Sequence, residues 1–496
     1  MTTETLVPLA NTDRLFIDGE WVKPSSDAGF DVIDSATEEV YFRVAAAQPA
    51  DMDLAIGAAR RAFDRGPWPR MTHVERAGYL QRMADELEVR SSDYPAMWPR
   101  ESGVLHAVAT VSEPGNPEML RQFAELATDY PFEEPFTPSA SMMTGGGHGL
   151  LVREPVGVVG AIIPWNAPLP LILIKIAPAL LCGCTVIVKM SPEAPGAGYL
   201  MAEIADAVGL PAGVLNVITA DREVSELMVR DHRVDKIAFT GSTAAGRKIG
   251  ALCGGRIARC TLELGGKSAA VVLDDADMGA AATVLAGAEC FLSGQVCASL
   301  TRIVVPRKRH DEFAEALAVA FAAVQVGDPF DAATQMGPLA MERQRDRVEH
   351  YIARGVEEGA TLVTGGGRPK ALRRGFYVEP TVFAGVDNKH VIAQEEIFGP
   401  VLCVIPADND EHAVDIANDT IYGLNAAVFT PDAARARQVA GRLRSGTVGH
   451  NGTRFDMSVA FGGFKQSGIG REGGREGLHA YLETKTVLLD DDPYRK

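Results

Sequence analysis

The sequence feature that most constrains the fold is a regular alternation of two kinds of segment. Short apolar runs rich in β-branched residues predict strands, and alanine-rich stretches with helical periodicity separate them. Strands that are apolar throughout and alternate with helices are typical of parallel sheets covered by helices on both faces. The predicted strands are Val156–Ile163, Thr185–Val188, Val214–Ile218, Lys236–Phe239, Ala269–Leu273 and Thr301–Val305, with helices such as Tyr199–Ala207 and Ala244–Leu252 between them.

The same alternation continues in the second half of the chain. Helices are predicted at Phe313–Val324 and His412–Asn418, and strands at Val401–Ile405 and Ala426–Phe429. A chain of 496 residues is long enough for more than one folding unit. We therefore predict an α/β protein with two α/β domains. Residues 131–149 carry prolines and a glycine run instead, and we expect them to leave the first domain as an excursion.

Charge and hydropathy exclude several classes of protein. The formal charge of −17 and the pI of about 5.1 argue against a nucleic-acid binder, which usually has a basic excess. The first residues lack the basic and apolar regions of a signal peptide, so no targeting segment is predicted. The most apolar stretch, Leu169–Val188, is interrupted by Pro170, Lys175 and Pro178 and is interpreted as buried core, so we predict no membrane association.

The cysteines indicate a reducing compartment. The chain has seven cysteines, an odd number and few for its length, so a disulfide framework is improbable. We expect reduced thiols and a cytoplasmic location. Cys182 and Cys184 have no partner cluster at zinc-ligand spacing, so no metal site is predicted.

Four short motifs carry candidate chemistry. Cys297 follows a Gly-Gln turn, where a thiol has the backbone freedom that a nucleophile needs. Glu263 stands at a strand-to-loop junction, Asn166 follows the strand Val156–Ile163, and Ser242 begins a helix whose N–H groups suit a phosphate. Each motif alone is equally compatible with a structural role: a buried thiol, a surface carboxylate, a turn or a helix cap.

Together, in this order and spacing, the motifs resemble those of the aldehyde dehydrogenase superfamily. The resemblance runs from Phe16–Trp21 to Glu483–Val487 and so covers nearly the whole chain. It includes the segments Gly327–Pro329, Gly337–Leu339, Glu395–Pro400 and Phe461–Gly468. A chance match to all of them is very improbable.

The resemblance implies NAD(P)⁺-dependent oxidation of an aldehyde to a carboxylic acid. Cys297 is implied as the nucleophile that forms a thiohemiacetal and then a thioester. The Asn166 amide and the Cys297 main-chain N–H would stabilise the oxyanion. Glu263 would activate water for hydrolysis of the thioester, and Lys175 and Glu472 match the positions of a proton relay.

The resemblance also implies the residues of a dinucleotide site. This site lacks the G-x-G-x-x-G fingerprint of other dinucleotide folds. The implied contacts are Ile162, Ile163, Pro164 and Trp165 along the cofactor, Lys189 and Ser191 at the adenosine ribose, Ser242 at the pyrophosphate, and Gln344, Glu396 and Phe398 at the nicotinamide end. Gly241 and Leu264 are also implied as cofactor contacts.

Two departures from the family pattern concern the adenosine end. Many relatives carry a glutamate at the position of Pro192, which excludes the 2′-phosphate of NADP⁺ by charge repulsion; here Glu193 is one residue further on. Many relatives have glycines where this chain has Thr219–Arg222. We therefore predict NAD⁺ as the preferred cofactor, with measurable use of NADP⁺.

The family architecture implies two doubly wound α/β domains and a β oligomerisation arm. The dinucleotide-binding domain would comprise residues 1–135 and 156–262, and the catalytic domain residues 263–466. The arm would comprise residues 136–155 and 467–496, and pairing of its strand edges between subunits would give a homodimer or homotetramer.

Apolar residues match the family's substrate tunnel, which predicts apolar aldehydes as substrates. These residues are Leu171, Ile174, Val296, Phe455 and Phe461. Three alternatives remain open at this point: a CoA-acylating or phosphorylating relative, a non-catalytic protein on the same fold, and a cysteine hydrolase. Glu263 disfavours the CoA-acylating relative, and retention of Cys297, Glu263 and Asn166 together disfavours a non-catalytic protein. The lack of a histidine partner motif disfavours a hydrolase.

Overall fold

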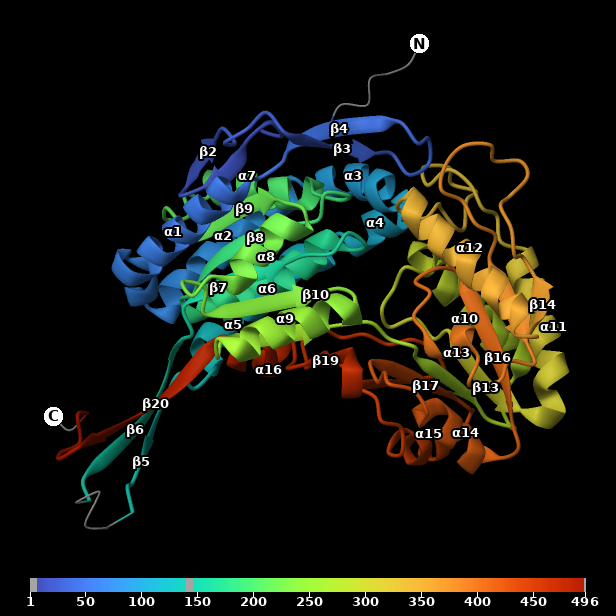
Figure 1. Ribbon diagram of the computed structural model, residues 1–496. Helices are drawn as coiled ribbons and strands as arrows, with labels where there is room; N and C mark the ends of the chain where they lie inside the picture. The colour runs from blue at the N-terminus through green and yellow to red at the C-terminus, as the bar shows by residue number, and fades with distance from the viewer. Residues whose placement is uncertain (1–6, 140–145, 495–496) are drawn as a thin grey trace.

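The computed structural model describes residues 7–139 and 146–494. The predicted first domain and arm include residues 1–6, 140–145 and 495–496, which lie outside the described residues. Two large sheets flanked by helices make up most of the molecule, and a narrow three-stranded sheet projects from it (Figure 1). This arrangement confirms the predicted α/β class.

The first sheet has eight strands in the order β19-β11-β10-β7-β8-β9-β1-β2. Its five central strands are parallel, and antiparallel strands close both edges. Successive side chains enter two different cores, Val158 and Ile187 on one face and Val159 and Val186 on the other, which explains why the strands are apolar throughout. The strands are β1 (Leu15–Ile17), β2 (Glu20–Val22), β7 (Val158–Ile162), β8 (Thr185–Met190), β9 (Leu215–Thr219), β10 (Lys236–Thr240), β11 (Arg259–Glu263) and β19 (Gly468–Ile469).

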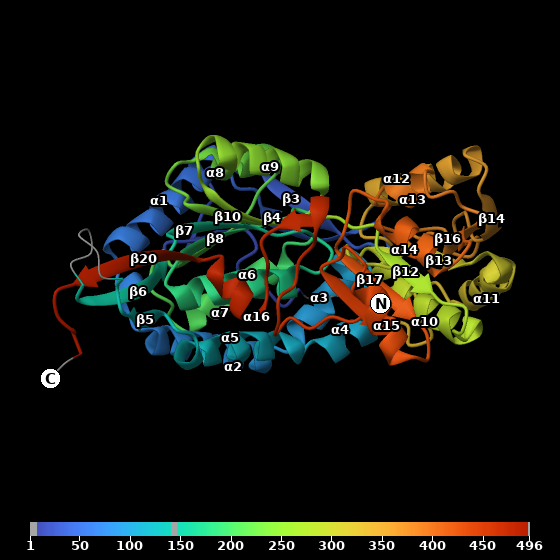
Figure 2. The same cartoon turned by 90° about the horizontal axis from the view of Figure 1, so that it is seen from below.

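Helices cover both faces of this sheet, as the second view shows (Figure 2). One face carries α1 (Pro49–Arg65), α8 (Arg222–Arg230) and α9 (Thr243–Gly255). The other carries α2 (His73–Val89), α3 (Asp93–Ser102), α4 (His106–Ser112), α5 (Gly115–Asp129), α6 (Pro168–Cys182), α7 (Gly196–Ala207) and α16 (Gly474–His479). A separate hairpin consists of β3 (Gly29–Ile33) and β4 (Val40–Ala45).

The second sheet has seven strands in the order β14-β15-β16-β13-β12-β17-β18, all parallel except for the β14–β15 pair. Two cores again lie on its two faces. The strands are β12 (Ala269–Val272), β13 (Arg302–Pro306), β14 (Thr361–Thr364), β15 (Thr381–Ala384), β16 (Val401–Ala407), β17 (Asn425–Phe429) and β18 (Thr447–His450). The helices are α10 (Met278–Cys290), α11 (His310–Ala322), α12 (Glu342–Glu357), α13 (Val391–Gln394), α14 (Asp410–Asn418) and α15 (Ala433–Ala440).

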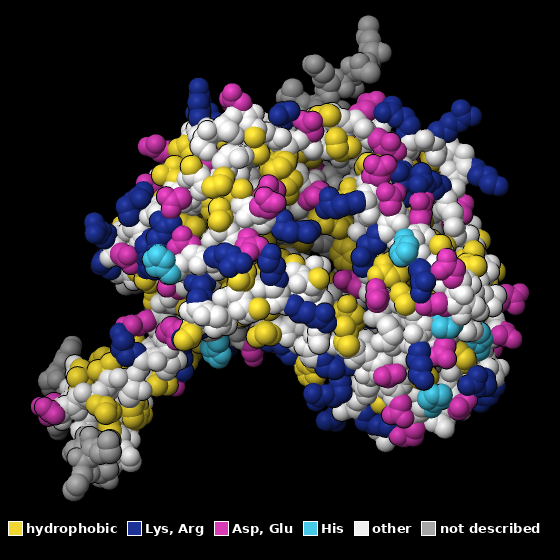
Figure 3. Space-filling view, viewed as in Figure 1, with side chains coloured by type: hydrophobic (Ala, Val, Ile, Leu, Met, Phe, Trp, Pro, Cys, Tyr) yellow, Lys and Arg dark blue, Asp and Glu magenta, His cyan; other side chains and the backbone are white. Residues whose placement is uncertain are grey.

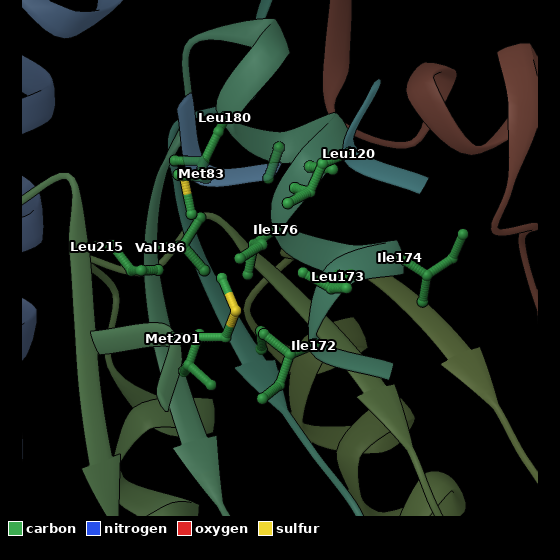
Figure 4. Packing of buried hydrophobic residues seen from close by; sticks show 14 of the residues in the cluster. Met83, Leu120, Ile172, Leu173, Ile174, Ile176, Leu180, Val186, Met201 and Leu215 are labelled. Atoms are coloured by element: carbon green, nitrogen blue, oxygen red, sulfur yellow. The ribbon is translucent and has the colours of Figure 1, made fainter. Parts of the chain in front are cut away.

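Helix α6 is the apolar centre of the first domain. Pro168 occupies its first turn, and Gly183 ends it in the left-handed region at φ 99°. Ile172, Ile176 and Leu180 pack against the sheet and neighbouring helices (Figure 4). Every residue from 172 to 190 is buried, which confirms the interpretation of the apolar stretch as core. Every helix among the described residues is too short or too polar to cross a lipid bilayer.

The projecting sheet consists of β5 (Glu133–Phe136), β6 (His148–Pro155) and β20 (Leu482–Leu489). Strand β6 lies in the middle and pairs with β20 over its full length, from Pro155 opposite Leu482 to His148 opposite Leu489. The described part of the predicted excursion therefore leaves the first domain as β5 and β6, and the C-terminal segment returns along it (Figure 1).

Candidate active site

The candidate site lies where the parallel strands of the first sheet end on one edge. The pairing register places Lys189 of β8 beside Ile162 of β7, and Glu263 of β11 beside Thr240 of β10. The chain runs from β7 to β8 and β9 on one side and then places β10 on the other side of β7, so the topological switch point lies between β7 and β10. Ligands of open α/β sheets bind outside the carboxyl ends of the strands at such a point.

The turn after β7 is held by two side chains of α3. The indole Nε1 of Trp98 donates a hydrogen bond to the main-chain oxygen of Asn166 at 2.8 Å, and Ser102 Oγ donates to that of Trp165 at 2.6 Å. Asn166 is buried, and its Nδ2 donates to the main-chain oxygen of Gln295 at 3.0 Å. One proton of this amide is thereby used, and the second is available to a ligand.

Cys297 lies in the loop between the 3-10 helix η2 (Phe291–Gly294) and β13. It is half-buried, and a Cβ on Gly266 would come within 2.4 Å of its main-chain oxygen, so a side chain at position 266 would displace the loop. Burial, together with the charges of Glu396 and Glu263, raises the pKa of the Cys297 thiol to about 12. This shift favours the neutral thiol, so a nearby base must take its proton before it can act as a nucleophile.

Glu263 is the last residue of β11 and is 4% exposed. Neither of its carboxylate oxygens has a hydrogen-bond partner among the described residues. Burial and the charge of Glu472 raise its pKa well above the ordinary value, while Lys175 and Arg471 act in the opposite direction. A buried carboxyl group with a raised pKa and no fixed partner is suited to act as a base near neutral pH.

Lys175 and Glu472 form a buried ion pair behind this carboxyl group. Lys175 Nζ lies 2.7 Å from Glu472 Oε1 and donates to Thr240 Oγ1 at 2.6 Å, and both charged side chains are almost fully buried. Thr240 is the neighbour of Glu263 in the strand register. The structure thus brings together the three ionisable groups that the sequence predicts for base catalysis and proton transfer.

The predicted adenosine contacts lie at the end of β8. Burial lowers the pKa of Lys189 to about 8, although the charges of Glu193 and Asp221 oppose this shift. Ser191 Oγ donates to a carboxylate oxygen of Glu193. Arg343 of α12 reaches across from the second domain and forms an ion pair with Glu193 at 2.6 Å. The carboxylate of Glu193 therefore lies beside Ser191 despite the proline at position 192.

The predicted pyrophosphate contacts lie at the start of α9. Ser242 is exposed and caps the helix by accepting a hydrogen bond from Ala245 N at 3.3 Å, with Gly241 directly before it. The predicted residues Ile162 and Leu264 belong to the buried core on the α9 face of the sheet, and Ile163 belongs to the core on the α6 face. These three apolar side chains therefore contribute to the site chiefly by packing in the cores on which it rests.

At the predicted nicotinamide end, residues of both domains meet. The rings of Trp165 and Phe398 contact each other edge-on, with centroids 5.3 Å apart, and Pro164 precedes this tryptophan. Glu396 Oε1 accepts a hydrogen bond from Gly266 N at 3.2 Å, and burial raises the pKa of Glu396 to about 7. Gln344 Nε2 donates to the main-chain oxygens of Ile397 and Phe398 at 3.2 and 2.7 Å, so it orients the loop that carries Phe398.

The predicted tunnel residues divide into two groups. Val296 and Phe461 pack in one cluster with Cys297. The rings of Phe455 and Phe461 meet edge-on, with their centroids 6.1 Å apart. Leu171 and Ile174 lie on α6 and pack in its core, where Ile174 is 3% exposed. Val296 contacts both clusters and connects the groups.

Several residues that shape this site have no motif of their own. Met457 packs against both apolar clusters, and the only sign of it in the sequence is an apolar position two residues after Phe455. Trp98, Ser102 and Arg343 act across long sequence separations, so no local pattern could have identified them.

The space-filling view shows a hollow between the domains with Lys and Arg side chains around it (Figure 3). Among the described residues, no group of three His, Cys, Asp or Glu side chains could hold a metal ion.

Comparisons with known proteins agree with one another. The model of the aldehyde dehydrogenase family matches residues 21–487. The chain is 44% identical to geranial dehydrogenase of Castellaniella defragrans over 477 residues, which are 96% of this chain and 98% of that protein. An aldehyde dehydrogenase of Mycobacterium tuberculosis complexed with NAD⁺ superimposes with a TM-score of 0.93 at 45% identity, covering 96% of this chain and 98% of that one. A cysteine-to-alanine mutant of aldehyde dehydrogenase C from Pseudomonas syringae, complexed with NAD⁺ and octanal, gives a TM-score of 0.93 at 37% identity, covering 99% and 100%.

Proposed function

The chain belongs to the aldehyde dehydrogenase family, and on that premise we propose which of its residues carry out the reaction. The protein is an NAD(P)-dependent oxidoreductase that converts an aldehyde to a carboxylic acid. We assign Cys297 as the nucleophile, Asn166 as an oxyanion donor and Glu263 as the general base. The contact that supports this assignment most strongly is the hydrogen bond from Asn166 to Gln295, because it fixes the amide two residues from the thiol.

In the acylation half of the reaction, Cys297 attacks the carbonyl carbon of the aldehyde. Its thiol must first lose a proton, which the nearby carboxylate of Glu263 accepts and then releases through Lys175 and Glu472 before deacylation. As the carbon–sulfur bond forms, the free N–H of the Asn166 amide and the main-chain N–H of Cys297 stabilise the charge on the oxygen. Bound NAD⁺ supplies the hydride acceptor. Cys297 then holds the acyl group as a thioester.

In the deacylation half, Glu263 takes a proton from water as the water attacks the thioester carbon. The carboxylic acid leaves, and Cys297 departs as a thiolate. The raised pKa of Glu263 makes its carboxylate a stronger base than an exposed glutamate. We assign Lys175 and Glu472 to transfer of the resulting proton away from Glu263, because the ammonium bonds both to Glu472 and to Thr240, the strand neighbour of Glu263.

The residues at the strand ends suit a dinucleotide. Ser242 is exposed at the start of α9, where main-chain N–H groups and the helix dipole favour a phosphate. Among the described residues, Glu396 accepts one hydrogen bond, at Oε1, so Oε2 remains an acceptor for ribose hydroxyls. Lys189 and Ser191 would contact the adenosine ribose. Trp165 and Phe398, supported by Gln344, would flank the nicotinamide end.

We propose that NAD⁺ is preferred and that NADP⁺ is used measurably. The carboxylate of Glu193 lies beside Ser191 and acts on the charge of Lys189, so it can repel a 2′-phosphate at this end of the site. Its partner Arg343 is 64% exposed, so this ion pair is weakly fixed. A 2′-phosphate could replace Glu193 as the partner of Arg343, and this new ion pair would offset part of the repulsion and allow NADP⁺ to bind.

We propose that the substrate is an apolar aldehyde of medium length or an aromatic one. Val296, Phe461 and Met457 pack in one apolar cluster with Cys297, and burial of each CH₂ group of a substrate against such a surface gains ~0.8 kcal/mol. A panel of alkanals, terpenoid and aromatic aldehydes, a charged semialdehyde and betaine aldehyde tests this proposal through NADH formation without CoA. Apolar aldehydes should give the highest kcat/KM. A best value for a charged aldehyde would contradict the substrate proposal, and a need for CoA would contradict the role of Glu263.

We propose the domain division as residues 1–135 and 156–262 for the dinucleotide domain, 263–466 for the catalytic domain, and 136–155 with 467–496 for an oligomerisation arm. The strand pairs support one refinement. Strand β19 pairs with β11, and α16 packs on α5 and α6, so residues 468–479 belong with the first domain and the arm resumes at β20. An assembly of two or four copies through this arm is testable by light scattering.

A cytoplasmic location stays a prediction that rests on the seven free cysteines.

A further inference from the structure

The loop before the proposed nucleophile has an unusual backbone. Leu292, Ser293 and Gly294 are three consecutive residues in the left-handed region, with φ values of 52°, 54° and 72°. Only the last is a glycine, and left-handed backbone is unfavourable for the other two residue types. Such a conformation persists only where the surrounding structure imposes it. The question is therefore which groups impose it.

The side chain of Gln295 is the centre of that restraint. It is fully buried, and its Nε2 donates to the main-chain oxygens of Leu292 at 3.0 Å and Ser102 at 3.1 Å. Its Oε1 accepts from Ala340 N at 2.9 Å. The amide thus makes three hydrogen bonds to three different segments. Ser293 adds a second restraint, because its Oγ lies 2.8 and 3.1 Å from the main-chain oxygens of Gly337 and Pro338.

These bonds close a ring around the proposed oxyanion donor. Gln295 Nε2 donates to Ser102 O, Ser102 Oγ donates to Trp165 O, and the next residue, Asn166, donates from Nδ2 back to Gln295 O. The ring connects the C-terminal end of α3, the turn after β7 and the loop of Cys297. Ser102 and Gln295 are 0% exposed, so water does not compete for these bonds.

We propose that Gln295 and Ser102 are positioning residues that set the Asn166 amide against the Cys297 thiol. The ring uses one N–H of the amide and directs the other towards the place where the oxyanion forms. The restraint on Leu292 and Ser293 sets the path of the chain into Cys297. This inference rests on the proposed roles of Cys297 and Asn166 and adds the groups through which these roles depend on the fold.

Gln295→Met and Ser102→Ala test the proposal. Gln295→Met keeps the length of the side chain and removes all three hydrogen bonds; a misplacement of about 1 Å can lower kcat ~10²-fold. Ser102→Ala removes only the bond to Trp165 and should lower kcat roughly tenfold. In both variants the dissociation constant of NAD⁺, measured by quenching of tryptophan fluorescence, should stay within about twofold of wild type, since the ring bonds to the proposed cofactor contact Trp165 only at its main-chain oxygen and not at its indole.

A double-mutant cycle separates positioning from general stability. If Ser102 acts through Asn166, Ser102→Ala should have little further effect on kcat in an Asn166→Ala background. Equal effects of Ser102→Ala in both backgrounds would overturn the proposal, as would a Gln295→Met enzyme with wild-type kcat per titrated thiol. Melting temperatures of all variants identify those that fail to fold, and the milder Ser102→Ala then carries the test. Full activity in Cys297→Ala or Asn166→Ala would instead contradict the proposed function.

Discussion

The proposed reaction end and the proposed adenosine end of the site are built differently. Around Asn166 and Cys297, buried side chains from three segments make hydrogen bonds of 2.6 to 3.1 Å. At the adenosine end, Lys189 Nζ donates to Ala220 O at 3.5 Å, and Glu193 pairs with an Arg343 that is largely exposed. One end is held by closed networks, and the other by a long contact and a solvent-facing ion pair.

The difference indicates how each end tolerates change. Displacement of a reacting group by about 1 Å can cost ~10²-fold in rate, so the reaction end should respond steeply to small substitutions. An exposed ion pair contributes ~0–1 kcal/mol, so changes at the adenosine end should alter cofactor choice by small factors. Substitutions at the two ends should therefore differ in the size of their effect on the rate and on cofactor choice.

Cys297→Ala should abolish aldehyde oxidation with either cofactor. No other described cysteine packs with Val296 and Phe461 in this cluster, so no second thiol can form the thioester. Cofactor affinity should be little changed. Steady-state NADH formation and a separate fluorescence titration measure the two effects, and Cys403→Ala, at a buried thiol in the core of the second domain, serves as the control. Turnover of Cys297→Ala at the wild-type rate would show that Cys297 is not the nucleophile.

Glu263→Gln should slow steady-state turnover by ~10²–10⁴-fold, since it removes the general base. Acylation should suffer less, so a burst of NADH of about one equivalent per site should precede the slow phase in rapid mixing. In the wild type, deacylation should fall as pH decreases through the raised pKa of Glu263, because only the carboxylate accepts a proton. The slow phase of the variant should lose this pH dependence. An unchanged pH profile would indicate that another group is the base.

Asn166→Ala should lower kcat by ~10²–10³-fold through loss of one oxyanion donor. The affinity for NAD⁺ should stay close to that of the wild type, because the amide is directed to the Cys297 loop. Comparison of kcat with the dissociation constant separates the two functions. A variant that keeps its maximal rate and loses NAD⁺ binding would show that Asn166 is a cofactor contact instead.

Glu193→Gln should narrow the preference for NAD⁺ over NADP⁺ by a few-fold. The substitution removes the negative charge beside Ser191 and releases Arg343 to pair with a phosphate. Arg343→Gln is the matched variant and should weaken NADP⁺ more than NAD⁺. The ratio of kcat/KM for the two cofactors, together with binding titrations, measures both. If neither variant changes the ratio, selectivity resides elsewhere, and the contrast between the two ends of the site loses its basis.

Much of this protein could be predicted from local sequence patterns. The apolar runs around Ile187 and Val304 became central strands because a strand buried on both faces has to be apolar throughout. Asn166 and Ser242 could be placed at strand ends because each comes three residues after such a run, and Glu263 could be placed at a strand-to-loop junction because two glycines follow soon after it. Glycines at positions 265 and 266 mark close approaches to Glu396 and to the main chain of Cys297, which a side chain would block.

Tertiary structure alone decided how these pieces act on one another. Ser102 is 193 positions from Gln295, and Glu193 and Arg343 belong to different domains, so no periodicity or spacing links them. The raised pKa of Glu263 depends on burial and on Glu472, which the fold brings to the same edge. Local propensity determines whether a segment becomes a strand or a helix. Hydrogen bonds, desolvation and charge depend on distance in space, and those distances exist only after the two sheets have packed together.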